Sequence, residues 1–162
     1  GKDMYLKEII QHVTIPVLRK DFTVDPYMIY QARMLGASAI LLICSLLSQS
    51  ELEEYQAMAT ELGMSALVEA HDEREVEMAL RAEAFIIGVN NRDLKTFTVD
   101  INNSARYRKM VPKEVAFVSE SGIKTAEDIA KLLENGTDAV LIGETLMRSA
   151  NKKQALDELR GM

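Results

Sequence analysis

Ionisable and amide side chains follow several short apolar runs of the sequence, close to the points where those runs end. They are Lys20, Glu69, Asn90 and Glu120. An ammonium group and two carboxylates held at one apolar mouth perturb each other's pKa values, and such sets perform general acid–base chemistry. These four residues are therefore candidate catalytic groups.

The apolar runs predict the elements that position these side chains. Six short runs rich in Val, Ile and Leu alternate with segments of helical spacing, and they start roughly 20 to 30 residues apart, the size of one βα unit. Regular alternation favours a parallel sheet flanked by helices. The runs are residues 15–18, 39–44, 66–68, 85–89, 115–118 and 139–142.

The carboxyl ends of parallel strands lie on one rim, which is where α/β proteins bind ligands. Lys20 shares strand parity with Leu18, and Glu120 shares it with Val118, so both face the same interior as their apolar neighbours. The alternative is that strand ends are polar because they meet water, and that these groups form structural ion pairs. For one residue that alternative is favoured, whereas for four at matched positions the two interpretations carry equal weight.

Two glycine-containing turns indicate an anion site on the same rim. Ser121 and Gly122 lead from one run into a helix that Thr125 caps, and Gly143 and Glu144 follow the next run. Glycine allows backbone N–H groups to approach an anion at a helix N-terminus. The alternative is that each glycine serves only the geometry of its turn.

Composition excludes several classes of protein. The chain has 162 residues, with 25 acidic against 19 basic side chains, so it has no basic surplus to neutralise nucleic-acid phosphates. We find no apolar run near the ~20 residues of a membrane span and no secretory signal. The single cysteine, Cys44, excludes an internal disulfide and suits a reducing cytosol. His12 and His71 lack metal-binding spacing, and we expect His71 to be a surface histidine.

Six strings, in order over almost the whole chain, resemble the indole-3-glycerol phosphate synthase family of tryptophan biosynthesis. They are PVLRKDF (16–22), DPYMIYQAR (25–33), LVEAHDE (67–73), IIGVNNRDLKTF (86–97), VSESGIKT (118–125) and DAVLIGETLMR (138–148). The resemblance implies a (β/α)8 barrel, of which residues 1–162 form one partial domain with about six βα units, strands 3–8, preceded by one helix.

The resemblance also implies a reaction. The family is a carbon–carbon lyase that converts 1-(2-carboxyphenylamino)-1-deoxyribulose 5-phosphate into indole-3-glycerol phosphate, CO2 and water, without a metal or organic cofactor. The implied partner is this small phosphorylated substrate, rather than a nucleic acid or a membrane, and the implied location is the cytoplasm.

The same resemblance implies the role of each site residue. Lys20 is the general acid at the ribulose carbonyl, and Glu69 is the acid–base partner in the later dehydration. Asn90, Arg92 and Glu120 orient and polarise the substrate. The remaining positions bind it: Ser121, Gly122, Gly143 and Glu144 hold the phosphate, mostly through backbone amides, and Leu41 and Leu94 form apolar walls for the aromatic ring.

The family's N-terminal extension and first two βα units, which carry a Glu, a second essential Lys and a Ser-Pro-Ser stretch, have no counterpart here. We therefore expect unpaired strand edges at residues 15–19 and 139–142, covered by oligomerisation or by a missing N-terminal segment of a larger enzyme. Two alternatives to a catalytic core stay open. One is an inactive part-barrel that retains only phosphate or ligand binding, and the other is a different phosphate-binding barrel, such as the isomerase of the same pathway, which the rim set disfavours.

Overall fold

A computed structural model describes residues 2–93 and 96–161 and has the order of elements that the sequence predicts. Within these ranges, a helix precedes six strands, and helical segments follow each strand. The strands are β1 (Leu18–Arg19), β2 (Ala39–Ile43), β3 (Ser65–Ala70), β4 (Ile86–Asn90), β5 (Ala116–Glu120) and β6 (Ala139–Leu141). The helices are α1 (Asp3–His12), α2 (Pro26–Met34), the 3-10 turn η1 (Cys44–Leu46), α3 (Gln49–Glu61), α4 (Glu73–Arg81), α5 (Asn102–Arg108), α6 (Ala126–Glu134), α7 (Glu144–Arg148) and α8 (Lys152–Leu159).

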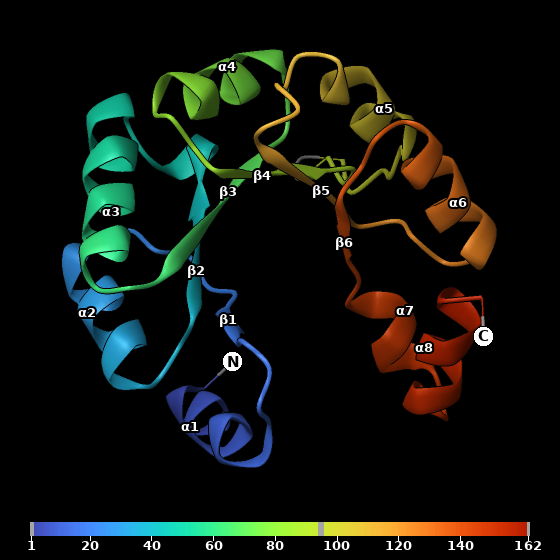
Figure 1. Ribbon diagram of the computed structural model, residues 1–162, viewed down its shortest axis with the longest axis horizontal. Coiled ribbons are helices and arrows are strands. Elements are labelled where there is room, and N and C mark those ends of the chain that lie inside the picture. The colour runs from blue at the N-terminus through green and yellow to red at the C-terminus, as the bar shows by residue number, and fades with distance from the viewer. Residues whose placement is uncertain (1, 94–95, 162) are drawn as a thin grey trace.

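The strands form one parallel sheet whose order follows the chain from β1 to β6. The sheet curls into an arch with α2–α6 along its outer side, α1 at one end and α7 and α8 at the other (Figure 1). This is an incomplete (β/α)8 barrel of about six units. In the described part of the chain, β1 and β6 each pair with one neighbour, so the sheet has two open edges.

The two faces of the sheet bury different clusters of side chains. The outer face packs against the helices and forms the larger core, which includes Ile40, Leu42, Val68, Ile87 and Phe117. The inner face carries a smaller cluster of four buried residues, with Leu18, Ile86 and Leu141 packed against it. Those four are Leu41, Ile43, Leu67 and Val118. Alternation along each strand produces this division, because successive side chains point to opposite faces.

The two edge strands are shorter than the apolar runs that predicted them. Residues 15–17 precede β1, and residue 142 follows β6. An edge strand has a hydrogen-bonding neighbour on one side only, which limits the length of its regular ladder. The chain before β1 still lies beside β2, because the Ser38 amide donates to the Val17 carbonyl at 2.9 Å.

Two helices, α3 and α6, begin with capping boxes, which fix the ends of the loops that lead into them. Ser48 caps α3 and pairs with Glu51, and Thr125 caps α6 and pairs with Asp128. In each box the side chain of the cap accepts from a backbone N–H while the acidic side chain accepts from the backbone of the cap. The second box fixes the exit from the loop that follows β5.

A buried polar network joins that loop to the segment after β4. The Asn91 side chain donates to the Ser119 hydroxyl at 3.0 Å and to the Ser121 carbonyl at 3.1 Å, and its oxygen accepts from the Ser104 hydroxyl at 2.8 Å. Ser121 has a φ of 67°, in the left-handed region that residues with a side chain rarely adopt. The network therefore holds a strained backbone at the rim.

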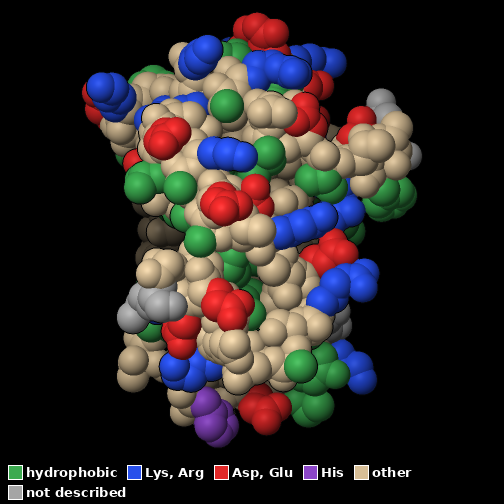
Figure 2. Space-filling view, turned by 90° about the vertical axis from the view of Figure 1, so that its right-hand side faces the viewer, with side chains coloured by type: hydrophobic (Ala, Val, Ile, Leu, Met, Phe, Trp, Pro, Cys, Tyr) green, Lys and Arg blue, Asp and Glu red, His purple; other side chains and the backbone are tan. Residues whose placement is uncertain are grey.

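On the side of the molecule where α6–α8 lie, acidic and basic side chains are interspersed (Figure 2). In the two described ranges, no helix combines the length and the apolar composition needed to cross a membrane.

We expect Asn91→Ala to lower the free energy of unfolding by roughly 1–3 kcal/mol, because the Ser104 N–H and the Ser121 carbonyl each lose a buried partner. Urea denaturation followed by circular dichroism measures this loss. The matched control is Asn102→Ala on the exposed surface, which should change stability by less than about 0.5 kcal/mol. Equal effects of the two substitutions would contradict the role of the network.

Candidate active site

The register of the parallel strands places the predicted catalytic residues side by side on neighbouring strands. Glu69 on β3 pairs with Gly88 on β4, and Asn90 on β4 pairs with Glu120 on β5. These side chains share parity with the inner apolar cluster, as the alternation predicts. Lys20 directly follows β1 and reaches the same point from the edge of the sheet.

Lys20 lies between the two carboxylates. Its Nζ donates to Glu69 Oε2 at 2.9 Å and lies 3.3 Å from Glu120 Oε2. Asn90 Nδ2 donates to the other oxygen of Glu69 at 3.0 Å. The side chains of Glu69 and Glu120 are 4% and 1% exposed, whereas that of Lys20 is 40% exposed. The structure thus brings all four predicted catalytic residues together, with the cation as the member most open to solvent.

Gly88 makes room for the Glu120 carboxyl group. A Cβ atom at position 88 would collide with Glu120 Oε1 and press on a methyl group of Leu67. The carboxyl group therefore lies against the bare backbone of β4. Both of its oxygens are buried and have no hydrogen-bond partner among the described residues, so the ion pair with Lys20 is its main stabilising contact.

The two carboxyl groups differ in their affinity for a proton. Burial raises the pKa of Glu69, but contacts with His71, Asn90 and Lys20 outweigh it and lower that pKa to about 2. Burial and the nearby charge of Glu69 raise the pKa of Glu120 to about 7, against the opposing effect of Lys20. A proton taken up by the pair near neutral pH therefore goes to Glu120, while Glu69 stays ionised.

Lys20 stays protonated in this setting. Its burial lowers the pKa, but the carboxylates of Glu120 and Glu69 outweigh that effect and raise it. The cluster thus holds a proton donor, an ionised base and a third group that titrates near neutrality. Such a division of roles supports acid–base catalysis.

His71 is the residue that the sequence analysis missed. It was predicted to be a surface histidine, but its side chain is only 15% exposed and lies 3.2 Å from Glu69 Oε1 through Nε2. Glu75 contacts the other ring nitrogen at 3.0 Å. The signal in the sequence was its parity with Glu69 two residues earlier and the acidic residue four positions later.

The predicted phosphate-binding residues line a cavity beside this cluster. The cavity has a volume of about 770 Å³, and basic side chains at its wall include Arg92, Lys124 and Arg148. Five predicted substrate-binding residues lie on it, namely Arg92, Ser121, Gly122, Gly143 and Glu144. The Thr145 hydroxyl donates to the Ile123 carbonyl at 2.6 Å and thereby joins the two glycine turns.

The side chain of Glu144 is engaged by two arginines, which leaves its backbone N–H as the group expected to bind phosphate. Its carboxylate pairs with Arg92 at 2.8 Å and with Arg148 at 2.9 Å, and these arginines lower its pKa. A carboxylate repels a phosphate, so a contact at this position must come from the backbone N–H. The arginines are available to an anion that displaces the carboxylate.

The two predicted apolar wall positions differ in what the structure describes. Leu41 belongs to the inner cluster and is 2% exposed, whereas Leu94 lies outside the described residues. Cys44 is buried at the end of β2, as expected of a core cysteine, and burial raises the pKa of its thiol to about 12.

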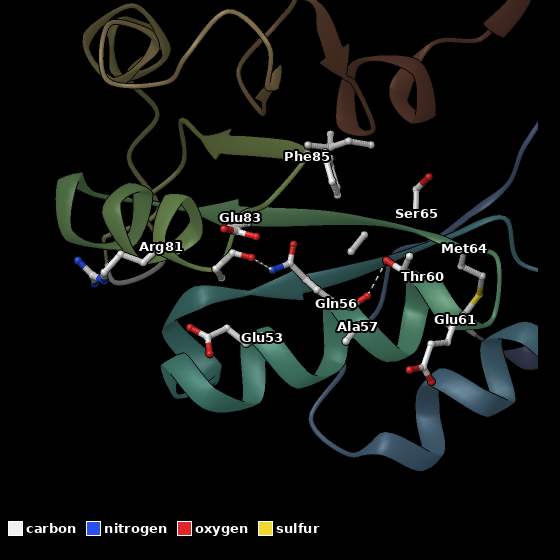
Figure 3. A pocket seen from close by; sticks show the side chains of 13 residues that line it. Glu53, Gln56, Ala57, Thr60, Glu61, Met64, Ser65, Arg81, Glu83 and Phe85 are labelled. Carbon is white, nitrogen blue, oxygen red and sulfur yellow. Dashed lines mark hydrogen bonds between the residues drawn. The ribbon is translucent and has the colours of Figure 1, made fainter.

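A second cavity, of about 890 Å³, lies at the opposite ends of the strands, between α3, the end of α4 and the starts of β3 and β4 (Figure 3). Its wall combines Glu53, Glu61 and Glu83 with Arg81 and the exposed ring of Phe85. Gln56 and Thr60 on α3 donate hydrogen bonds to the backbone carbonyls of Ala82 and Gln56. Among residues 2–93 and 96–161, no cluster of His, Cys, Asp and Glu could hold a metal ion.

The fold is that of a (β/α)8-type barrel, and the carboxyl ends of its strands carry a cluster of one ammonium group and two buried carboxyl groups. The sequence profile described as indole-3-glycerol phosphate synthase matches residues 1–159. The chain belongs to the indole-3-glycerol phosphate synthase family.

Curated relatives carry the same name. The synthase of Ruminiclostridium cellulolyticum is 58% identical over 161 residues, which cover 99% of this chain and 62% of the relative. That of Lacticaseibacillus paracasei is 56% identical over 152 residues, which cover 94% of this chain and 58% of the relative. The chain therefore spans about three fifths of the length of the curated relatives that it matches.

Solved structures agree on the fold. The tryptophan synthase A-subunit from the hyperthermophile Pyrococcus furiosus superposes with a TM-score of 0.76 at 15% identity, over 99% of this chain and 72% of that one. At this identity the likeness shows the barrel-type architecture alone.

We expect Glu120→Gln to stabilise the chain at pH 8.5 by more than about 1 kcal/mol relative to its effect at pH 5. The pKa of Glu120 is raised to about 7, so the folded chain binds a proton more tightly than the unfolded chain does. Stability is therefore lost as pH rises from about 4.5 to about 7, and the amide removes that loss.

Urea denaturation at the two pH values measures this difference. The control is Glu114→Gln, at an exposed position in the turn that precedes β5. A pH-independent effect of Glu120→Gln would contradict the raised pKa.

Proposed function

We propose that this chain carries the acid–base site of an indole-3-glycerol phosphate synthase, a carboxy-lyase of tryptophan biosynthesis that acts in the cytoplasm. The observation that supports the proposal most directly is the contact of Lys20 with the ionised Glu69 at 2.9 Å, beside a second carboxyl group. Ring closure requires a proton donor, and the following dehydration requires a base. The cluster offers both at one place.

Ring closure begins with Lys20. As the carboxyl-bearing ring carbon of the substrate forms a bond to the ribulose carbonyl carbon, the ammonium donates its proton to the carbonyl oxygen, which becomes a hydroxyl. The carbon–carbon bond to the carboxylate then breaks, CO2 leaves, and its electron pair restores the aromatic ring. Asn90 and Glu120 orient the substrate in this step.

Dehydration completes the indole ring. The new hydroxyl takes up a proton from solvent and leaves as water, and Glu69 accepts the proton that the neighbouring ring carbon loses as the double bond forms. Glu69 then releases that proton to solvent, and Lys20 regains from solvent the proton that it gave in ring closure. A carboxylate whose pKa lies far below neutrality stays available as the base at every physiological pH. The aromatic ring lies against Leu41 and Leu94 in this proposal.

The substrate phosphate occupies the cavity beside the cluster. In this proposal the backbone N–H groups of Ser121, Gly122, Gly143 and Glu144, which line the cavity, bind the phosphate, and Arg92 supplies positive charge. The Arg92 backbone is hydrogen-bonded to the proposed catalytic residue Asn90, because its N–H donates to Asn90 Oδ1 at 3.0 Å. The phosphate site and the acid–base site thereby share one rigid segment.

Turnover is measured as fluorescent indole-3-glycerol phosphate formed by the 162-residue chain, alone and mixed with the part of the R. cellulolyticum relative that lies outside the match. We expect Lys20→Ala to reduce kcat by about 10²–10⁴-fold and Glu69→Gln to reduce kcat more than it raises KM. Lys113→Ala on the exposed surface is the control. Normal turnover by Lys20→Ala, or a pure loss of substrate affinity in Glu69→Gln, would contradict these roles. If no product forms with the chain alone or with the mixture, a part-barrel that only binds ligand would be favoured.

The open edges of the sheet need a cover in this proposal. β1 and β6 expose unpaired backbone groups, and the inner cluster is only partly closed at Leu18 and Leu141. We propose that either a second copy of the chain or a segment like the part of the longer relatives that lies outside the match pairs with these edges.

Analytical ultracentrifugation tests the edges. We expect association of the chain with itself or with the added part of the relative, and we expect Ala139→Lys, an exposed position on β6, to weaken it, because a lysine on an edge strand opposes pairing. A monomer at every concentration, unchanged by the added part, would contradict the proposal.

A further inference from the structure

His71 contacts the proposed base but has no part in the reaction described above. It follows β3 directly and shares the parity of Glu69. Its Nε2 atom is completely buried and lies 3.2 Å from Glu69 Oε1. This contact raises the pKa of His71 and lowers the pKa of Glu69.

Glu75 fixes the ring of His71 from the other side. One oxygen, Oε2, accepts from the His71 backbone N–H at 2.8 Å and lies 3.0 Å from Nδ1. Glu75 is itself placed by the first turn of α4, where its N–H donates to the carboxylate of the cap residue Asp72 at 2.8 Å. The imidazole therefore cannot turn away from Glu69 without losing this anchor.

The three partners of Glu69 approach from three elements. Lys20 at the end of β1 contacts Oε2, while Asn90 on β4 and His71 after β3 contact Oε1. We propose that His71, held by Glu75, is a positioning residue that keeps the Glu69 carboxylate ionised and oriented toward the substrate. This inference rests on the proposed function for its catalytic meaning, but the pairing itself does not depend on turnover.

The surrounding charges keep the imidazole protonated. Burial lowers the pKa of His71, but Glu69 and Glu75 outweigh it and raise that pKa to about 9. The other titratable groups that face this set are Lys20 and Glu120 across the sheet, Asp72 at the cap of α4, and Cys44 on η1. The Cys44 thiol is neutral near physiological pH, because its pKa is raised to about 12. Among the described residues, the cations in contact with Glu69 are His71 and Lys20.

The chain contains only two histidines, His12 and His71, which makes the pairing directly measurable. NMR titration of histidine-labelled chain should show one signal that disappears in His12→Asn and a second, from His71, that titrates about two pH units above an ordinary histidine. Glu75→Gln and Glu69→Gln should each lower that second pKa. A His71 signal that titrates like an ordinary histidine, or that ignores both substitutions, would overturn the proposal.

The pH dependence of turnover tests the positioning role. In His71→Asn the pKa of Glu69 should rise, because an opposite charge is lost, so the acidic limb of the kcat/KM profile should move about one unit toward higher pH. A histidine that served only the fold would lower the rate without moving this limb. His12→Asn is the control, and His71→Gln is the second variant in case the first does not fold.

The two arms separate this inference from the proposed function. Product formation decides the reaction, whereas the NMR titration needs no substrate. If no turnover is found, carboxyl-labelled glutamate provides the second arm: the Glu69 signal, identified by its loss in Glu69→Gln, should titrate at higher pH in His71→Asn. An unchanged Glu69 titration in that variant would overturn the proposal.

Discussion

A single cation shared by two buried carboxyl groups is the interaction on which the rest of the site depends. Glu69 and Glu120 are almost completely buried, and two such groups cannot both hold a negative charge without a compensating partner. Lys20 supplies that partner at 2.9 and 3.3 Å. The unequal surroundings of the two carboxyl groups then decide which one keeps the proton. Glu69 also contacts Asn90 and His71, whereas among the described residues the Glu120 oxygens have no hydrogen-bond partner and form an ion pair with Lys20.

The curled parallel sheet holds these charges in place. Parallel register sets Glu69 beside Gly88 and Asn90 beside Glu120, although each pair is widely separated along the chain. The missing side chain at Gly88 leaves the space for the Glu120 carboxyl group. Behind the rim, the buried Asn91 side chain links the segment that carries Asn90 to the turn after Glu120, so the charged cluster and the Ser121–Gly122 turn are held together.

Much of this arrangement could be predicted from the sequence, and the exceptions have physical causes. Period-two alternation and strand-end position placed Lys20, Glu69, Asn90 and Glu120 on one inner rim, because both properties are local. The role of His71 could not be predicted in this way, since it depends on how the chain turns from β3 into α4 and brings Glu75 back to the ring. The shortness of β1 and β6 depends on their lack of a second neighbour, which no local pattern records.

The exposure of the three charged groups indicates what a cover over the open side of the arch would change. The two carboxyl groups are already desolvated by the six strands and their helices, at 4% and 1% exposed, whereas Lys20 is 40% exposed. Burial of a lysine lowers its pKa, so closure would make the ammonium a stronger acid while leaving the state of Glu69 nearly unchanged. The surroundings of Glu69 are thus complete within these strands, whereas those of Lys20 would change with any cover over the open side of the arch.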